Sequence, residues 1–244
     1  MNAPRVLLAG DSALVVEFGD RIDPALNREV RELWRAMDRA ALPGVVELVP
    51  TYRSLLVCYD PLVIDADDLQ GRILEIERHK GELELVAPRV IHVPVVYGGE
   101  FGPDLPAVAR HAGLTEAQVV AIHSDAEYLV YMLGFSPGFP YLGGMSQRIA
   151  APRLATPRTV IPAGSVGIAQ RQTGIYPVES PGGWQLIGRT PLRLFDPARR
   201  PPTLFEAGDA IRFVPVGEDE YREIEGRVRD GSWAPEAGNT GAAR

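Results

Sequence analysis

The sequence predicts an α+β protein with two domains, a small α/β domain followed by a β-barrel or sandwich domain. In the first 88 residues, apolar runs and helical periods follow the order β-α-β-β-α-β, which is the ferredoxin-like pattern. Beyond that point, many short apolar runs alternate with glycine and proline, which is typical of barrels and sandwiches. The predicted domains are 1–88 and 89–228, and a small, polar, glycine-rich segment at 229–244 is predicted to be a flexible tail.

The first domain begins with a predicted strand at 12–18 and a helix after it. Asp23-Pro24 provides an N-cap and a proline at the first helical position. Apolar residues then recur at helical spacing, namely Ile22, Leu26, Val30, Leu33, Trp34 and Met37. Pro43-Gly44 is expected to end this helix.

The rest of the first domain follows from similar patterns. Strands are predicted at 45–49 and 55–59, and the second of them lies next to a polar turn. Asp65 caps a second helix whose apolar stripe contains Leu69, Ile73, Leu74 and Ile76. A last strand at 83–86 completes the ferredoxin-like order.

The second domain opens with a strand at 90–97 that contains Pro94, so we expect an edge strand or a bulge. A helix is predicted at 104–112, and the capping box of Thr115 and Gln118 begins another that runs to His123. From residue 127 onward only short strands are predicted, at 128–133, 159–161, 166–169, 185–187, 192–195 and 210–214.

Composition excludes several functional classes. The chain has 244 residues, is 45% hydrophobic and carries a formal net charge of −7, which argues against nucleic acid or anionic membrane as a main partner. Cys58 is the only cysteine, so disulfide frameworks and CxxC zinc sites are excluded. The sequence shows neither a signal-peptide pattern nor an apolar run of membrane-spanning length, and a cytoplasmic protein is expected.

The scarcity of lysine excludes further functions. Lys80 is the only lysine, and it lies at the end of a predicted helix beside His79. A P-loop needs a Gly-Lys-Ser/Thr sequence, a Schiff-base enzyme needs a buried lysine, and a biotin carrier needs a lysine in a hairpin turn. Lys80 matches none of these, so the chain has no biotin-attachment lysine and no P-loop for ATP.

Two motifs suggest catalysis or metal binding and are rejected on chemical grounds. Residues 134–138 fit the G-x-S-x-G pattern of a hydrolase nucleophile elbow, but the residue after Ser136 is Pro137, which lacks the N–H that an oxyanion hole requires. The four histidines precede this serine and form no His-Glu-x-x-His pair, so no metal site is predicted. His123 alone is kept as a candidate because it precedes the segment richest in motifs.

The segment 161–184 is dense in glycine, serine, glutamine, threonine and aromatic residues, which suits a site that binds through backbone and amide groups. These glycines can equally close the turns of a barrel. Arg158 and Arg189 flank the segment, and a planar guanidinium suits a carboxylate or a phosphate. The nearby carboxylates, Glu179 and Asp196, do not single out an acid or a base, so the catalytic residues stay unassigned.

Several motifs together resemble one family. They are YMLGFSPGFPYLGG at 131–144, PAGSVGIA at 162–169, QTGIYP at 172–177 and SPGGWQLIGRTP at 180–191. They resemble subunit 1 of allophanate-hydrolase-like carboxyltransferase domains, a family that includes the subunit-B protein of bacterial ATP-dependent 5-oxoprolinase and an inhibitor of sporulation histidine kinase A. One departure is Gln170-Arg171, where the family pattern leads us to expect small residues, often glycine.

The resemblance implies a cyclophilin-like β-barrel as the second domain, and a partner of the subunit-2 or subunit-C type with a related barrel. For 5-oxoprolinase it also implies a subunit-A protein and the ATP-dependent opening of 5-oxo-L-proline to L-glutamate, with ATP used at the level of the complex. Two alternatives remain, a histidine-kinase inhibitor and a urea-carboxylase-like carboxyltransferase component. The site is placed on the barrel, with candidate substrate-binding residues Arg158, Ser165, Gln172, Thr173, Tyr176, Trp184 and Arg189, and with His123 and Phe139 at its edge.

Overall fold

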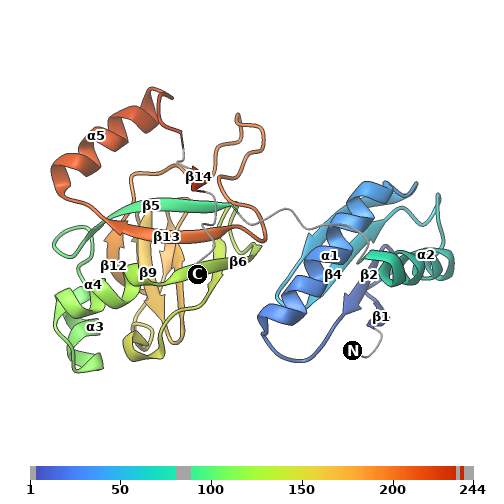
Figure 1. Cartoon of the computed structure of the whole chain (residues 1–244), viewed down its shortest axis with the longest axis horizontal. Coiled ribbons are helices and arrows are strands. Elements are labelled where there is room, and N and C mark those ends of the chain that lie inside the picture. The colour runs from blue at the N-terminus through green and yellow to red at the C-terminus, as the bar shows by residue number, and fades with distance from the viewer. Residues whose placement is uncertain (1–3, 81–88, 235–236, 239–244) are drawn as a thin grey trace. The chain divides into compact units, whose positions relative to one another are not determined.

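The structure, a computed structural model, describes residues 4–80, 89–234 and 237–238. The chain divides into two compact units, Met1–Ala87 and Pro88–Arg244. Figure 1 shows a sheet with helices beside it in the first unit and a larger, strongly curved sheet in the second. Each unit is described by itself.

The first unit contains a four-stranded antiparallel sheet. Its strands lie in the order β1 (Arg5–Leu8), β2 (Ala13–Glu17), β4 (Ser54–Tyr59) and β3 (Val45–Pro50). Alternate residues of the two central strands are buried, so one face of the sheet belongs to the core.

Two helices cover that face, α1 (Pro24–Ala40) and α2 (Ala66–His79). The predicted N-caps are confirmed, because Asp23 Oδ1 accepts from the Ala25 N–H at 2.8 Å and Asp65 Oδ1 accepts from the Asp68 N–H at 2.9 Å. The core joins helix and strand residues, namely Leu14, Val16, Val30, Leu33, Met37, Leu55, Val57, Tyr59, Ile64, Leu69 and Ile73.

The ferredoxin-like prediction for this unit is not confirmed. The predicted strands at 12–18, 55–59 and 45–49 are neighbours in the order that this fold requires. The edge beside β2, where the fold places its last strand, is occupied by β1, which the sequence did not predict. The predicted strand at 83–86 lies outside the described residues.

The second unit contains a sheet that nearly closes into a barrel (Figure 1). Its seven main strands lie in the order β10 (Gln172–Ile175), β9 (Ser165–Ala169), β12 (Gln185–Arg189), β5 (Val90–Tyr97), β13 (Ala210–Pro215), β6 (Glu127–Leu133) and β7 (Pro140–Gly143). The end strands β10 and β7 lie close to each other. Only β5 and β13 pair in parallel, and the other neighbours pair antiparallel.

The barrel-like sheet surrounds the largest core of the chain, which we call the main core. Its buried side chains come from strands and helices and include Ile91, Val93, Val95, Val108, Val119, Tyr128, Val166, Ile168, Ile175, Ile187, Ile211 and Phe213. Helices α3 (Leu105–Ala112) and α4 (Glu116–Asp125) pack against it. The predicted capping box is confirmed, since Gln118 N–H donates to Thr115 Oγ1 and the Thr115 N–H donates to Gln118 Oε1.

Two short elements and a helix complete the second unit. A two-stranded ribbon of β8 (Arg158–Ile161) and β11 (Ser180–Gly182) is separate from the barrel sheet, and a 3-10 turn, η2, spans Gln147–Ile149. Helix α5 (Glu218–Arg229) was missed because most of its residues are charged. Its Tyr221 is buried, and Ile224 and Val228 pack against the main core.

The strand at 90–97 was expected to be an edge strand or to carry a bulge because of Pro94, but β5 lies between β12 and β13 and keeps a continuous register with β13. The structure also differs from the sequence predictions in two later segments. The predicted strand at 192–195 is an irregular segment with a single bridge from Phe195 to Thr203, because prolines around it lack the N–H that a ladder needs. In the segment predicted as a tail, Arg229 ends α5, Trp233 packs against the main core, and β14 (Ala237–Gly238) pairs with β5. No described helix is long and apolar enough to cross a membrane.

Candidate functional site

The strand register distributes the candidate residues over the two faces of the barrel sheet. Side chains alternate between faces along a strand, and residues directly opposite on neighbouring strands share a face. Val166 and Ile168 of β9 point into the main core, so Ser165, Gly167 and Ala169 face the other side. On β10, Thr173 lies opposite Ile168, and Gly174 lies opposite Gly167. Thr173 therefore faces inward, whereas Ser165 faces outward.

The inward face holds a chain of hydrogen bonds through His123. Tyr97 Oη lies 2.7 Å from His123 Nδ1, and His123 Nε2 lies 2.9 Å from Thr173 Oγ1. The Thr173 hydroxyl donates to the Gly167 carbonyl at 3.0 Å, so it must accept from the Nε2–H of His123. His123 Nδ1 then accepts from the Tyr97 hydroxyl, and the imidazole is neutral with both nitrogens bonded.

Burial fixes the protonation state of this chain of hydrogen bonds. His123 is fully buried, and its burial lowers its pKa to about 3. Burial also raises the pKa of Tyr97 well above its ordinary value, so the phenol stays protonated. A histidine that is buried, neutral and bonded on both sides has no free nitrogen for a substrate proton. His123 and Thr173 thus organise the barrel interior.

The outward face carries a cluster of aromatic side chains, Phe139, Tyr176 and Trp184, which we call the aromatic cluster. Phe139 is edge-on to both other rings, with centroids 5.7 Å apart in each case. A Cβ at Gly174 would lie 2.9 Å from the Phe139 ring, so glycine allows the rings to approach the sheet. Burial raises the pKa of Tyr176. The three predicted aromatic residues are therefore brought together, as packed side chains.

Arg158 is held by a carboxylate that the sequence analysis did not select. Its Nη2 donates to Asp104 Oδ1 at 2.8 Å, and Asp104 Oδ2 accepts from the Leu186 N–H at 2.7 Å. Arg158 Nη1 is buried without a hydrogen-bond partner among the described residues. Asp104 is the residue just before α3, which begins with Leu105-Pro106. This N-cap position is the sequence feature that could have drawn attention to it.

Arg189 and Ser165 are direct cross-strand neighbours on β12 and β9. Ser165 is fully buried, Arg189 is half-buried, and Ser165 Oγ and Arg189 Nε both lack hydrogen-bond partners among the described residues. The Arg189 guanidinium carbon lies 5.6 Å from the centre of the Phe101 ring. Gln172, the remaining candidate, begins β10 and is half-buried.

The predicted loop rim at Gln170 has the backbone geometry that the family pattern implies. Gln170 has a φ of 53°, in the left-handed region that favours glycine. Its backbone pairs with Ala151 through hydrogen bonds of 2.6 and 3.2 Å. Gln170-Arg171 thus forms the exposed turn between β9 and β10.

Ser136 shows no feature of a catalytic nucleophile. Its backbone lies in the turn between β6 and β7, and strand β7 follows where a hydrolase elbow needs a helix. Its buried Oγ has no hydrogen-bond partner in the described part of the chain. Within that same part, no group of three or more His, Cys, Asp or Glu side chains could hold a metal ion.

Three surface clefts lie apart from the candidate residues. A cleft of about 430 Å³ lies between α5 and strands β5 and β13, with His92, Glu220 and Trp233 in its lining. Another of about 510 Å³ lies between α4 and β13, and one of about 340 Å³ lies between α1 and β3. None of the nine candidate residues lines any of the three.

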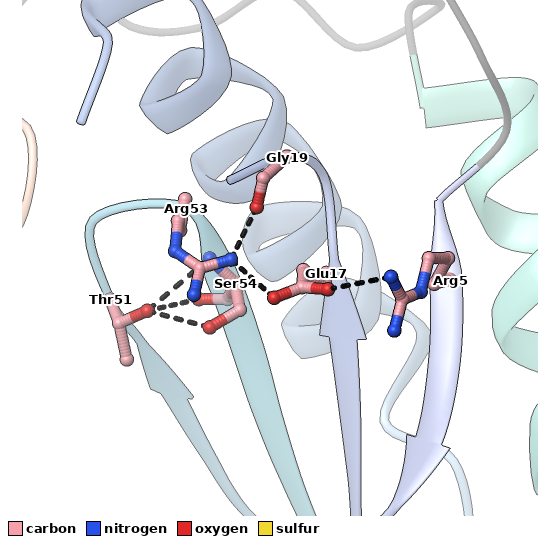
Figure 2. A network of polar contacts seen from close by, with 6 residues as sticks. All are labelled: Arg5, Glu17, Gly19, Thr51, Arg53 and Ser54. Atoms are coloured by element: carbon pink, nitrogen blue, oxygen red, sulfur yellow. Dashed lines mark hydrogen bonds and ion pairs between the residues drawn. The ribbon is translucent and has the colours of Figure 1, made fainter. Parts of the chain in front are cut away.

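Figure 2 shows a polar network in the first unit, whose residues Arg5, Glu17 and Ser54 belong to β1, β2 and β4. Arg53 donates to a carboxylate oxygen of Glu17 and to the Gly19 carbonyl, and Glu17 also pairs with Arg5 at 3.8 Å. Thr51 Oγ1 donates to the Ser54 carbonyl at 2.9 Å across the turn. These contacts are internal to the unit, so the network fixes the β3–β4 turn against β2.

Comparison with known proteins identifies the family. The sequence matches the carboxyltransferase domain family, subdomains C and D, over residues 4–205. The chain belongs to this family. Two curated relatives are named as the subunit-B protein of 5-oxoprolinase. The one from Bacillus subtilis is 48% identical over 87% of this chain and 92% of the relative, and the one from Escherichia coli O157:H7 is 46% identical over 89% and 99%.

Members of the carboxyltransferase domain family also occur within longer chains. The solved structure of TTHA0988 is 38% identical to this chain and superposes with a TM-score of 0.76. The match covers 84% of this chain but 40% of TTHA0988. The C and D subdomains of this family can thus form one part of a larger polypeptide.

Proposed function

We propose that the chain is the subunit-B protein of a bacterial ATP-dependent 5-oxoprolinase, which opens 5-oxo-L-proline to L-glutamate. The observation that carries this proposal is the 46–48% identity to proteins with that name, over nearly the full length of those proteins. The match includes both units, so it does not rest on the barrel alone. The proposal includes a cyclophilin-like barrel as the second domain and a cytoplasmic location.

The proposed activity belongs to a complex and not to this chain alone. The partners are a subunit-C protein with a related barrel and a subunit-A protein. An unstrained lactam is a poor electrophile, and phosphorylation of its amide oxygen by ATP would make water attack easier. The sequence has no P-loop lysine, because Lys80 is its only lysine and follows His79. Lys80 is buried, which its place at a helix end did not predict, and Glu29 and Glu77 bind its ammonium group. ATP is therefore proposed to bind at the level of the complex, and the isolated chain is proposed to be inactive.

The substrate-facing part of this chain is proposed to lie on the outward face of the barrel sheet. The residues there are the aromatic cluster, Ser165 and Arg189. Arg158 lies on the separate ribbon and is linked to β12 through Asp104. Both arginines carry N–H groups that suit the carboxylate of 5-oxoproline. Thr173 and His123 lie on the inward face and support the strands that carry this surface.

Reconstitution tests the proposal. The chain is co-expressed with its subunit-A and subunit-C partners, and glutamate release from 5-oxo-L-proline is measured with and without ATP. We expect release that requires ATP and all three proteins. A complete set that is inactive on 5-oxoproline would contradict the proposal, as would full activity without this chain.

A further inference from the structure

Arg189 is a half-buried cation with no carboxylate partner among the described residues. Arg158 pairs with Asp104 at 2.8 Å, and Arg193 pairs with Asp196 at 3.1 Å. Arg189 instead lies over the Phe101 ring, which shields one face of its guanidinium group, and its Nε is buried and unbonded. A charge removed from water without a counter-charge is unfavourable, so an anion bound at Arg189 would be stabilising.

Ser165 provides a second unused polar group at the same place. It lies directly opposite Arg189 on the neighbouring strand, and opposed residues have Cβ atoms about 4.5–5.5 Å apart. Ser165 is fully buried, and its Oγ has no partner in the described part of the chain. A buried hydroxyl without a partner costs about 1–3 kcal/mol, so this pair is an unusual feature in a packed region.

The turn before Ser165 is built to lie close to Arg189. Gly164 has a φ of 80°, and a Cβ there would lie 2.3 Å from the Thr190 carbonyl oxygen and 3.4 Å from Arg189 Cγ. The Thr190 N–H donates to the Gly164 carbonyl at 2.9 Å. Glycine thus allows the backbone to hold Ser165 and Arg189 at a fixed separation.

The stretch of sequence that contains Ser165 and Arg189 is positively charged although the whole chain is acidic. Residues 141–203 contain eight arginines and two acidic residues, Glu179 and Asp196, whereas the chain carries a formal net charge of −7. Such a local excess of one sign attracts small ions of the opposite sign. The charge therefore favours an anion as the ligand.

We propose that Arg189 and Ser165 together bind the anionic oxygens of a small molecule, either a carboxylate or a phosphate group. The half-exposed guanidinium donates to the anion first through its terminal nitrogens. Nε and the serine hydroxyl are buried in the structure, so they donate only after the Arg189 side chain moves to admit the ligand. The inference rests on the proposed function only for the identity of the natural ligand. If the proposed function holds, that ligand is 5-oxoproline, whose carboxylate would bind to Arg189 and Ser165. Phe101 then covers one face of the guanidinium and leaves its N–H edge for the anion.

The test is calorimetric binding to the purified full chain at pH 7 and low ionic strength. The probes are inorganic phosphate, 5-oxo-L-proline and 2-pyrrolidinone, a neutral lactam without a carboxylate. We expect an anionic probe to bind and the neutral lactam not to bind. Arg189→Gln should weaken binding about 10–100-fold, because a hydrogen bond to a charged group is lost, and Ser165→Ala should weaken it about 3–10-fold.

A matched control and separate outcomes complete the design. Arg193→Gln removes an exposed arginine from the same segment and should bind as the wild type does. If Arg189→Gln fails to fold, as judged by circular dichroism, Ser165→Ala carries the test. The inference is wrong if no anion binds, if the neutral lactam binds equally well, or if the folded variants bind as tightly as the wild type.

The inference and the proposed function fail separately. An active complex in which the Arg189→Gln and Ser165→Ala variants of this chain still bind anions normally would overturn the inference alone. An inactive complex in which this chain binds anions through Arg189 would overturn the proposed function alone.

Discussion

Replacing Lys80 with methionine should destabilise the first unit, because the only lysine of the chain is a buried link between its two helices. Lys80 Nζ lies 2.8 Å from Glu29 Oε2 of α1 and 2.9 Å from Glu77 Oε1 of α2. The lysine side chain is 6% exposed and each carboxylate 19%. The ammonium also lies 4.6 Å from the centre of the Phe18 ring.

The magnitude follows from the two carboxylates that the substitution would leave behind. Both oxygens lie within 3 Å of one nitrogen, so they are at most about 6 Å apart without it. Two like charges at that separation repel by about 3 kcal/mol at an effective dielectric constant of 20. Removing one partner of a buried ion pair typically costs about 3–5 kcal/mol. We expect Lys80→Met to lower the free energy of unfolding by about 3 kcal/mol.

Urea denaturation measures this loss, and hydrogen exchange of α1 and α2 amides assigns it to the first unit. Arg222→Gln is the control, because it removes an exposed i, i+4 pair with Glu218 and should change stability by less than about 0.5 kcal/mol. Adding Glu29→Gln and Glu77→Gln to Lys80→Met should recover most of the loss. A Lys80→Met protein within about 1 kcal/mol of the wild type would refute the argument.

Three further outcomes are expected. Amine-directed acylation of the native chain should modify the N-terminal amine and spare the buried Lys80. Peptide mass spectrometry measures the modification, and rapid modification of Lys80 before unfolding would contradict its burial. Ala41 caps α1 with a φ of 44°, so Ala41→Gly should raise stability by about 0.5–1 kcal/mol in thermal or urea unfolding, and a loss would contradict this. The buried His123 has a pKa of about 3, below its unfolded value of about 6.5, so the unfolded state binds the proton first as pH falls. The contribution of His123 to the free energy of unfolding is therefore complete above about pH 6.5 and is lost as the pH falls toward 3. The loss amounts to about 2 kcal/mol at pH 5. Denaturation curves measured from pH 7 to 5 should show that His123→Gln lacks this part of the pH dependence.

The elements that the sequence predicted well are those that local chemistry determines. Asp23, Asp65 and the Thr115–Gln118 capping box begin helices where predicted, because an N-cap satisfies backbone N–H groups within a few residues. Strand β1 was missed because only its pairing with β2 makes it a strand. Helix α5 was missed because its apolar stripe is narrow and was outweighed by charge.

The sequence selected candidate site residues, but it could not predict on which face of the sheet each side chain lies. Ser165, Thr173 and Arg189 were grouped because they are close in sequence and lie among glycines. Their faces depend on which residues oppose one another across strands, and that register follows from long-range pairing. Asp104 was not selected because its contact with Arg158 joins residues 54 positions apart.

The division of the site by the sheet determines which residues are available to a ligand. On the inward face, every polar atom of the Tyr97–His123–Thr173 chain already has a partner, and burial keeps the imidazole neutral. Binding a charged ligand there would break these hydrogen bonds in a region without compensating charge. On the outward face, Arg189 lacks a counter-charge among the described residues, and Ser165 Oγ lacks a partner there. Favourable ligand binding is therefore expected on the outward face. His123 would affect it only indirectly, because its hydrogen bond to Thr173 helps to position β10.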